Sequence, residues 1–189
     1  MQTEPVTDLK KKLKTNGVSS KRVVQNSKLM ALFEDQLKDI LWTEKELIKS
    51  IPRMISLAAS VELIEALTSH LEQTKEQVSR LAQVFRNVEI KPSTQKCEAM
   101  EGLIAEATKM LEDCEKGPWC DANIIAAAQK IDHYEIATYG TLIELANTMG
   151  LLDAAKLLEL TLKEEKSSDN ILTLVAREYV NVDVAAIRG

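Results

Sequence analysis

The chain has 189 residues, of which 45% are hydrophobic and only 4% aromatic, and its formal net charge is −5. This length is enough for one well-packed core, and the scarcity of aromatic residues, glycine and proline argues against a β-sandwich or β-barrel. No apolar run approaches the ~20 residues that a membrane-spanning helix needs. Residues 1–13 lack the apolar segment of a secretory signal, so we expect a helical protein with no membrane association.

Residues 1–27 have no sustained apolar periodicity and are predicted to form a flexible leader. The leader is basic, because residues 1–28 carry seven lysines and arginines against two acidic residues, a local net charge of +5. The rest of the chain then carries −10. Such a leader can stay solvated, or it can bind nucleic acid or another anionic surface. The sequence leaves both interpretations open.

The three cysteines, Cys97, Cys114 and Cys120, are odd in number and contain no CxxC pair. Free thiols in a cytoplasmic protein are the simplest interpretation of this pattern. A cysteine–zinc site is disfavoured, because structural zinc sites use four ligands, usually from paired cysteines or histidines.

Five helices are predicted after the leader. Ser27 can cap the first helix, which contains Pro52, and this proline is expected to kink or shorten it. Ser60 is a plausible cap for the second helix, and Gly150 is expected to end the fourth as a C-cap. The predicted ranges are 28–58, 60–87, 93–115, 121–149 and 151–180, followed by a short tail at 181–189.

Four glutamates lie on the four long helices, within or at the edge of the apolar stripe of each helix. They are Glu44, Glu72, Glu135 and Glu165. An ionised carboxylate is costly to bury without a partner. Four of them at core-facing positions therefore predict a shared partner, and a pair of metal ions is the simplest one.

The same glutamates relate the two halves of the chain. The third follows the first by 91 residues and the fourth follows the second by 93, which indicates a duplicated helical hairpin. The midpoint of each pair falls at a predicted turn, so the two glutamates of a hairpin are expected at one height. The predicted fold is all-α: a ferritin-like four-helix bundle of two hairpins over residues 28–180, with the helix at 93–115 in the crossover.

The neighbours of these glutamates decide the chemistry of the predicted site. In ferritin-like di-metal bundles, two helices each contribute a Glu and the other two each contribute Glu-x-x-His. Here Lys75 and Ser168 stand at the histidine positions, whereas Asp132 can join Glu135 on one helix face. An oxygen-only donor set favours hard ions such as manganese, magnesium or ferric iron. Glu101 can reach the site only if the crossover helix packs over it.

Other interpretations are open for these residues. Lys75 and Lys166 can neutralise neighbouring glutamates, which would give a buried ion-pair network without metal. Glu164 competes with the glutamate that follows it, because its own helix face is also apolar. His70 and His133 each precede a candidate glutamate by two residues, about 200° around a helix. We therefore interpret both histidines as structural, with His133 a possible donor to a ligand.

Several short segments of the helical region are distinctive. They are HLEQT at 70–74, AMEGLI at 99–104, AAAQK at 126–130, HYEIATYGTL at 133–142, AAKLL at 154–158 and EEK at 164–166. Together they resemble the YciE/YciF family of bacterial ferritin-like stress proteins. The resemblance covers residues 28–178, and HYEIATYGTL is its most specific segment.

The resemblance implies a rubrerythrin-like fold, a homodimer, a cytoplasmic location and a link to stress response. It also implies a di-metal site of iron or manganese with ferroxidase or peroxide-detoxifying activity. The family pattern carries over to Glu44, Glu72, Asp132, Glu135 and Glu165. The departures at the two histidine positions keep a second interpretation open, a non-enzymatic dimeric stress protein whose buried glutamates are ion-paired or hold a structural ion.

Overall fold

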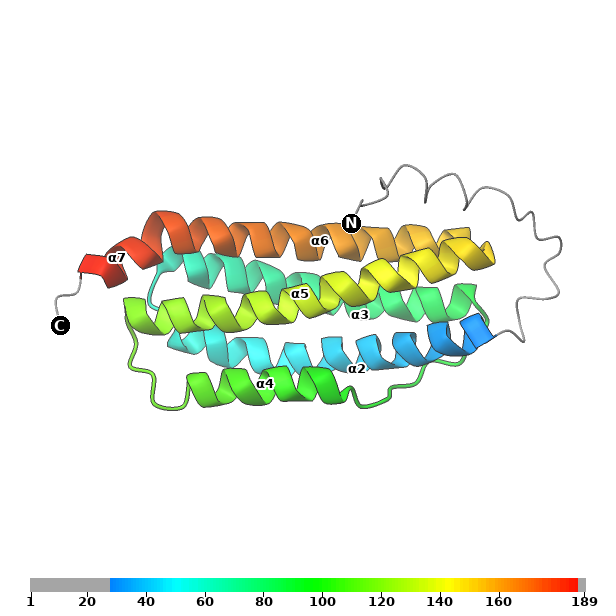
Figure 1. The fold of residues 1–189 in the computed structure, drawn as a ribbon, viewed down its shortest axis with the longest axis horizontal. Coiled ribbons are helices and arrows are strands. Elements are labelled where there is room, and N and C mark those ends of the chain that lie inside the picture. Colours follow the sequence, from blue (N-terminus) through cyan, green and yellow to red (C-terminus); the bar gives the residue numbers. More distant parts are fainter. Residues whose placement is uncertain (1–27, 187–189) are drawn as a thin grey trace, which may run out of the picture.

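The computed structural model describes residues 28–186, which fold into an elongated bundle of helices (Figure 1). The predicted leader at residues 1–27 lies outside the described residues. Within the described range, no helix is long and apolar enough to cross a membrane. The helical elements are α2 (Lys28–Leu57), α3 (Val61–Asn87), α4 (Glu98–Met110), α5 (Pro118–Met149), α6 (Leu152–Val175), a π-helical turn (Ala176–Val180) and α7 (Asn181–Ala186).

Four long helices form two antiparallel hairpins, α2 with α3 and α5 with α6 (Figure 1). α2 packs against α5 and α3 packs against α6, so the four helices surround one long core. The connection from α3 to α5 runs along the bundle and contains α4, which packs on α5 beside α2. The prediction of a ferritin-like four-helix bundle with an extra helix in the crossover is therefore confirmed.

The turns of both hairpins form as their sequences predict. Ser60 caps α3, and its Oγ accepts a hydrogen bond from the Leu63 N–H at 3.3 Å. Gly150 ends α5 with a φ of +74°, a left-handed conformation that glycine adopts at little cost. The Asp121 carboxylate on α5 accepts from the N–H groups of Ala59 (2.7 Å) and Ser60 (2.8 Å). This side chain joins the α2–α3 turn to the second hairpin.

The helices differ from the predicted ones at Pro52, in the crossover and at the C-terminal end. α2 continues beyond Pro52, because this proline is exposed and water can solvate the carbonyl that loses its N–H donor. α4 is shorter than the predicted 93–115, since Cys97 is its N-cap and accepts through Sγ from the Met100 N–H at 3.5 Å. Residues 181–186, expected to belong to a tail, form the short helix α7.

The core consists of two apolar clusters with a layer of polar residues between them. One cluster, which includes Leu47 and Leu63, fills the end of the bundle near the α2–α3 turn. The other cluster, which includes Phe33 and Phe85, fills the opposite end. Seven buried polar residues lie between these clusters, and we call them the polar layer. They are Glu44, His70, Thr74, Gln77, Asp132, Glu135 and Glu165.

Candidate metal centre

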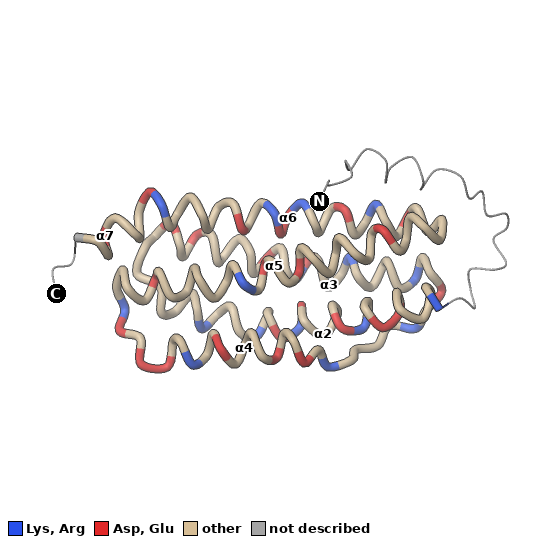
Figure 2. Tube along the Cα trace, in the orientation of Figure 1, with Lys and Arg blue, Asp and Glu red and all other residues tan. Residues whose placement is uncertain are grey.

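The structure brings four of the six predicted ligands together in the polar layer. Glu44 of α2, Asp132 and Glu135 of α5 and Glu165 of α6 are each at most 1% exposed. Acidic positions are visible near the middle of α5 in Figure 2. One ligand atom from each of His70, Asp132, Glu135 and Glu165 lies within 4.8 Å of the other three. The side chains of this second set, which contains His70 and not Glu44, therefore converge on one point in the core.

The other two predicted ligands, Glu72 and Glu101, do not belong to the site. The Glu72 side chain is 65% exposed and forms an ion pair with Lys75 at 2.6 Å. Residue 72 lies about 200° around α3 from His70, which faces the core, so its side chain must face solvent. Glu101 is half exposed and pairs with Lys96 at 2.6 Å, because α4 turns this face away from the bundle. Both assignments to the metal site are wrong.

Lys75 can neither replace a metal ion nor neutralise the polar layer, because it lies at the surface with Glu72. Exposed ion pairs of this i, i+3 kind contribute little to stability. We expect Lys75→Ala to change the free energy of unfolding by less than about 0.5 kcal/mol, measured by urea denaturation at neutral pH. A loss of several times that amount would instead indicate that Lys75 neutralises a buried carboxylate.

His70 occupies the place on α3 that was predicted for Glu72. It is 7% exposed, and its Nε2 lies 3.9 Å from Asp132 Oδ1. Burial lowers the pKa of His70 to about 4, so its imidazole is neutral at physiological pH. Neutral imidazole is the form that binds metal ions. His133, by contrast, lies at the surface beside Asp169. The interpretation of both histidines as non-ligands therefore agrees with the position of His133 but not with that of His70.

The spacing of the duplicated hairpins could have shown that Glu72 does not face the core. Glu135 follows Glu44 by 91 residues, and a constant offset would place Thr74, not Glu72, opposite Glu165. The predicted offset of 93 residues in the second pair adds two residues, about 200° of rotation. With the constant offset, Thr74-x-x-Gln77 on α3 corresponds to Glu165-x-x-Ser168 on α6. Both histidines and one glutamate of the Glu-x-x-His pattern are thus replaced.

A hydrogen-bonded group on α3 and α6 borders the polar layer. Gln77 donates through Nε2 to Glu165 Oε1 at 2.5 Å and to Glu164 Oε2 at 3.1 Å. Arg80 forms a two-fold hydrogen bond with the Glu164 carboxylate at 2.7 and 2.8 Å. Glu164, the alternative to Glu165, is therefore held by an arginine outside the core, whereas Glu165 faces the layer.

Tyr139 of α5 fixes Glu44 of α2. Its side chain is completely buried, and its hydroxyl donates a hydrogen bond to Glu44 Oε1. This bond leaves Oε2 of Glu44 as the oxygen available to another partner. Sequence patterns did not single out Tyr139, because a tyrosine on an apolar stripe is ordinarily interpreted as core.

Burial raises the pKa values of all four carboxylates of the polar layer. Burial raises the pKa of Glu44 to about 8, although the Tyr139 hydrogen bond opposes the change. Burial also raises the pKa of Asp132 to about 7. For Glu135 and Glu165, burial and then the neighbouring carboxylates raise the pKa well above the ordinary value. No lysine or arginine among residues 28–186 forms an ion pair with any of these four groups.

Several ligand atoms of the polar layer also have no hydrogen-bond partner in the described part of the chain. They are Glu44 Oε2, His70 Nδ1, Gln77 Oε1, Asp132 Oδ2, both oxygens of Glu135 and Glu165 Oε2. More than 90% of buried polar atoms in proteins are paired, so seven such atoms at one level indicate a missing partner. Carboxylate oxygens with one imidazole fit iron or manganese. The residues present therefore suit the metal ions that the fold class implies.

The fold and its buried carboxylates define a ferritin-like helical-bundle protein. The family described as "Domain of unknown function (DUF892)" matches residues 28–185, and the chain belongs to it. Protein YciF of Escherichia coli (strain K12) is 44% identical over 151 residues, which cover 79% of this chain and 91% of that protein. The family resemblance noted from the short sequence segments is therefore confirmed.

Solved structures agree with this assignment. The crystal structure of the E. coli stress protein YciF has a TM-score of 0.78 at 42% identity and covers 82% of this chain and 98% of that chain. YcfI of Rhodopseudomonas palustris has a TM-score of 0.77 at 41% identity, with 79% and 96% covered. A protein of Xanthomonas campestris has a TM-score of 0.66 at 19% identity, with 84% and 97% covered, and it shares the fold alone.

Proposed function

We propose that the polar layer is a carboxylate-rich di-metal site that binds iron or manganese. The observation that carries this proposal is the set of four buried carboxylates, Glu44, Asp132, Glu135 and Glu165, which have no lysine or arginine partner among the described residues. Four ionised carboxylates carry four negative charges, which two divalent ions neutralise. Without ions the same groups must bind protons or stay buried as uncompensated charges, which is unfavourable.

The residues of the layer would divide between two ion positions. His70 and Asp132 would hold the first ion, because their ligand atoms converge with those of Glu135 and Glu165. Glu44 would hold the second ion through Oε2, since Tyr139 already occupies Oε1. Glu135 has two unpartnered oxygens and would be a further ligand of the site. Oxygen ligands with a single nitrogen favour hard or borderline ions over copper.

Side chains around the layer would support such a site in three ways. The Gln77 amide orients Glu165 by a hydrogen bond of 2.5 Å, and the Tyr139 hydroxyl orients Glu44. The two apolar clusters exclude bulk water from both ends of the layer. Bound iron would supply the capacity to transfer electrons to O₂ or peroxide, which is the chemistry of a ferroxidase or a peroxide-detoxifying protein.

The biological setting is proposed from the relatives. E. coli YciF is described as a stress protein, and 44% identity supports a stress-response role for this chain. We propose that it acts in the cytoplasm, in keeping with its free thiols. We also propose that it is a homodimer, as the family resemblance implies. Binding of nucleic acid by the basic leader is the weaker part of this proposal, because it depends on composition alone.

Metal analysis and iron oxidation test the proposal directly. Purified wild-type protein should retain up to two equivalents of iron or manganese per chain, and it should oxidise Fe²⁺ in air faster than buffer alone. Glu135→Ala should lose both properties, because it removes two buried, unpartnered ligand oxygens. Metal at background level in the wild type, or equal oxidation rates for the two proteins, would exclude the di-metal oxidase.

A second candidate function follows from the replaced histidines. Thr74, Gln77 and Ser168 stand where the Glu-x-x-His pattern has one glutamate and both histidines. This loss favours a structural ion in a non-enzymatic dimeric stress protein. Retention of metal with a higher melting temperature but no Fe²⁺ oxidation would select this candidate over the oxidase.

A further inference from the structure

The polar layer is closed to solvent, so a cation can reach it only by passing between helices. Its carboxylates are at most 1% exposed, and apolar clusters cover both ends of the layer. Any route must therefore run through one of the grooves between adjacent helices. A groove that serves cations should contain oxygen atoms with no partner inside the protein, because such oxygens can replace the water ligands of an ion.

Thr43 marks one groove. It directly precedes Glu44, its side chain is 0% exposed, and its Oγ1 has no hydrogen-bond partner in the described structure. Six other helical threonines donate to the carbonyl four residues earlier: Thr68, Thr74, Thr108, Thr138, Thr141 and Thr148. Thr43 makes no such bond, so its hydroxyl oxygen is buried without a partner at the level of the polar layer.

Asp39 extends this feature toward the surface. It lies one helical turn before Thr43, on the same side of α2, and it is partly exposed. Its Oδ1 is buried and has no partner within residues 28–186. The neighbouring Lys38 carbonyl accepts from the Gln95 N–H, and Tyr134 of α5 lies beside Cys97. Asp39 therefore lies where α2 and α5 meet the chain that leads into α4.

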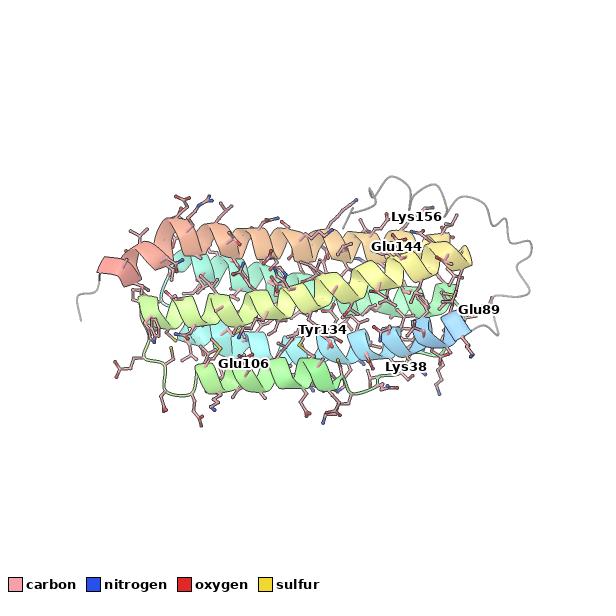
Figure 3. The ribbon with its side chains drawn as sticks, in the orientation of Figure 1. Lys38, Glu89, Glu106, Tyr134, Glu144 and Lys156 are labelled. Carbon is pink, nitrogen blue, oxygen red and sulfur yellow. The ribbon has the colours of Figure 1, made fainter. Side chains whose placement is uncertain are left out.

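The segment that leads into α4 crosses this groove. Tyr134 lies where α5 passes α2 near the beginning of α4 (Figure 3), and its hydroxyl is 2.8 Å from Cys97 Sγ. The Gln95 N–H donates to the Lys38 carbonyl at 3.2 Å. The chain from Gln95 to Cys97 therefore crosses α2 one residue before Asp39, beside the proposed mouth.

The groove between α3 and α6 is unsuited to a cation. The Arg80 guanidinium lies outside Gln77 there and is bound to Glu164 at 2.7 and 2.8 Å. Its side chain is 14% exposed, and it donates to Thr161 Oγ1 at 2.7 Å as well. Because Arg80 occupies the oxygens of Glu164 and Thr161, the described residues of this groove offer no unpaired oxygen between the surface and the polar layer.

We propose that Asp39 and Thr43 line the route by which divalent cations enter the polar layer, between α2 and α5. The route rests on the proposed function, because it presupposes a cation site. Asp39 attracts the hydrated ion at the surface, and the Thr43 hydroxyl replaces a water ligand as the ion moves toward Glu44. A substitution on the route should change the rates of cation binding and release together, whereas a substitution of a ligand should change the equilibrium affinity for the cation.

Uptake kinetics of Mn²⁺ test the route. Metal-free protein is mixed with Mn²⁺, EDTA is added after increasing intervals, and the protein-bound manganese is measured. Asp39→Asn and Thr43→Val should each slow uptake and release about tenfold, and the equilibrium affinity should change less than threefold. Asp153→Asn is the matched control, since it removes the same charge at the beginning of α6, where the side chain is 83% exposed, and it should leave both rates unchanged.

The outcomes separate the two proposals. Unchanged rates in both variants, with full occupancy, would overturn the route and leave the metal site intact. Weaker equilibrium binding without slower uptake would also overturn it, because Asp39 would then act as a ligand or a distant charge. Absence of bound Mn²⁺ in the wild-type protein would overturn the metal site and the route together.

Discussion

Glu135→Gln is expected to stabilise the metal-free protein and to abolish its metal binding. Glu135 is completely buried, and both of its oxygens lack a partner in the described chain. Burial and the nearby Glu165 raise its pKa well above the ordinary value. The folded state therefore has to protonate this group or keep it as an unfavourable charge. A glutamine of the same shape removes that cost and can donate its amide hydrogens to neighbouring carboxylates.

The expected magnitudes are large in both directions. Without metal at pH 8, the free energy of unfolding should rise by about 2 kcal/mol, which corresponds to about 4–8 °C in the melting temperature of a chain of this size. Affinity for Mn²⁺ should fall at least ~100-fold, because the amide supplies one weak ligand oxygen in place of two charged ones. Thermal unfolding with and without Mn²⁺ measures both effects.

Glu72→Gln is the matched control for this substitution. It makes the same chemical change at an exposed glutamate that sequence patterns had also assigned to the site. Neither the metal-free stability nor the affinity for Mn²⁺ should change in this variant. If Glu135→Gln lowered the metal-free melting temperature instead, the assignment of Glu135 as an uncompensated buried acid would be wrong.

The metal-free protein is expected to lose stability as the pH rises from 6.5 to 8.5. The pKa values of Asp132 and Glu44 are raised to about 7 and about 8 by burial. The folded state therefore keeps protons that the unfolded chain has released, and the stability from this difference is lost as pH rises through the folded pKa values. His70 acts in the opposite sense, with its pKa lowered to about 4, but its contribution is complete above pH 6.5.

Mn²⁺ should reverse this pH dependence. Metal binding requires ionised carboxylates, so its stabilising effect grows with pH. We expect the metal-free protein to lose about 2 kcal/mol between pH 6.5 and 8.5 and the Mn²⁺-saturated protein to lose little. Melting curves at the two pH values, with Mn²⁺ or with EDTA, provide the measurement. A flat or rising metal-free stability across this range would contradict protonated buried carboxylates.

Much of the fold followed from local sequence features. Ser60 and Gly150 set the turns of the two hairpins because a capping hydroxyl and a left-handed glycine are local requirements. The inward position of Glu44, Glu135 and Glu165 followed from the apolar residues around them. Asp121 was not recognised, because its two partners are backbone N–H groups about 60 residues away. Its role depends on the packed arrangement of the hairpins.

The rotation of α3 could not be obtained from hydrophobicity. The stripe that placed Glu72 at the core edge included Leu71 and Val78, which are only partly buried. The face that points into the bundle carries His70, Thr74 and Gln77 at mid-length, so its buried positions there are polar. Apolar periodicity does not identify the inward face of a helix where that face is polar. The wrong orientation of Glu72 was therefore predicted at the candidate site itself.

The division of the core has a consequence for how this bundle comes apart. Each apolar cluster is a separate body of side-chain contacts, and hydrogen exchange commonly resolves such bodies as distinct cooperative units. The polar layer between them adds few apolar contacts that could join the two ends. A pair of ions bound there would connect all four long helices at mid-length. We therefore expect occupancy of the layer to decide whether the two ends of the molecule open independently or only together.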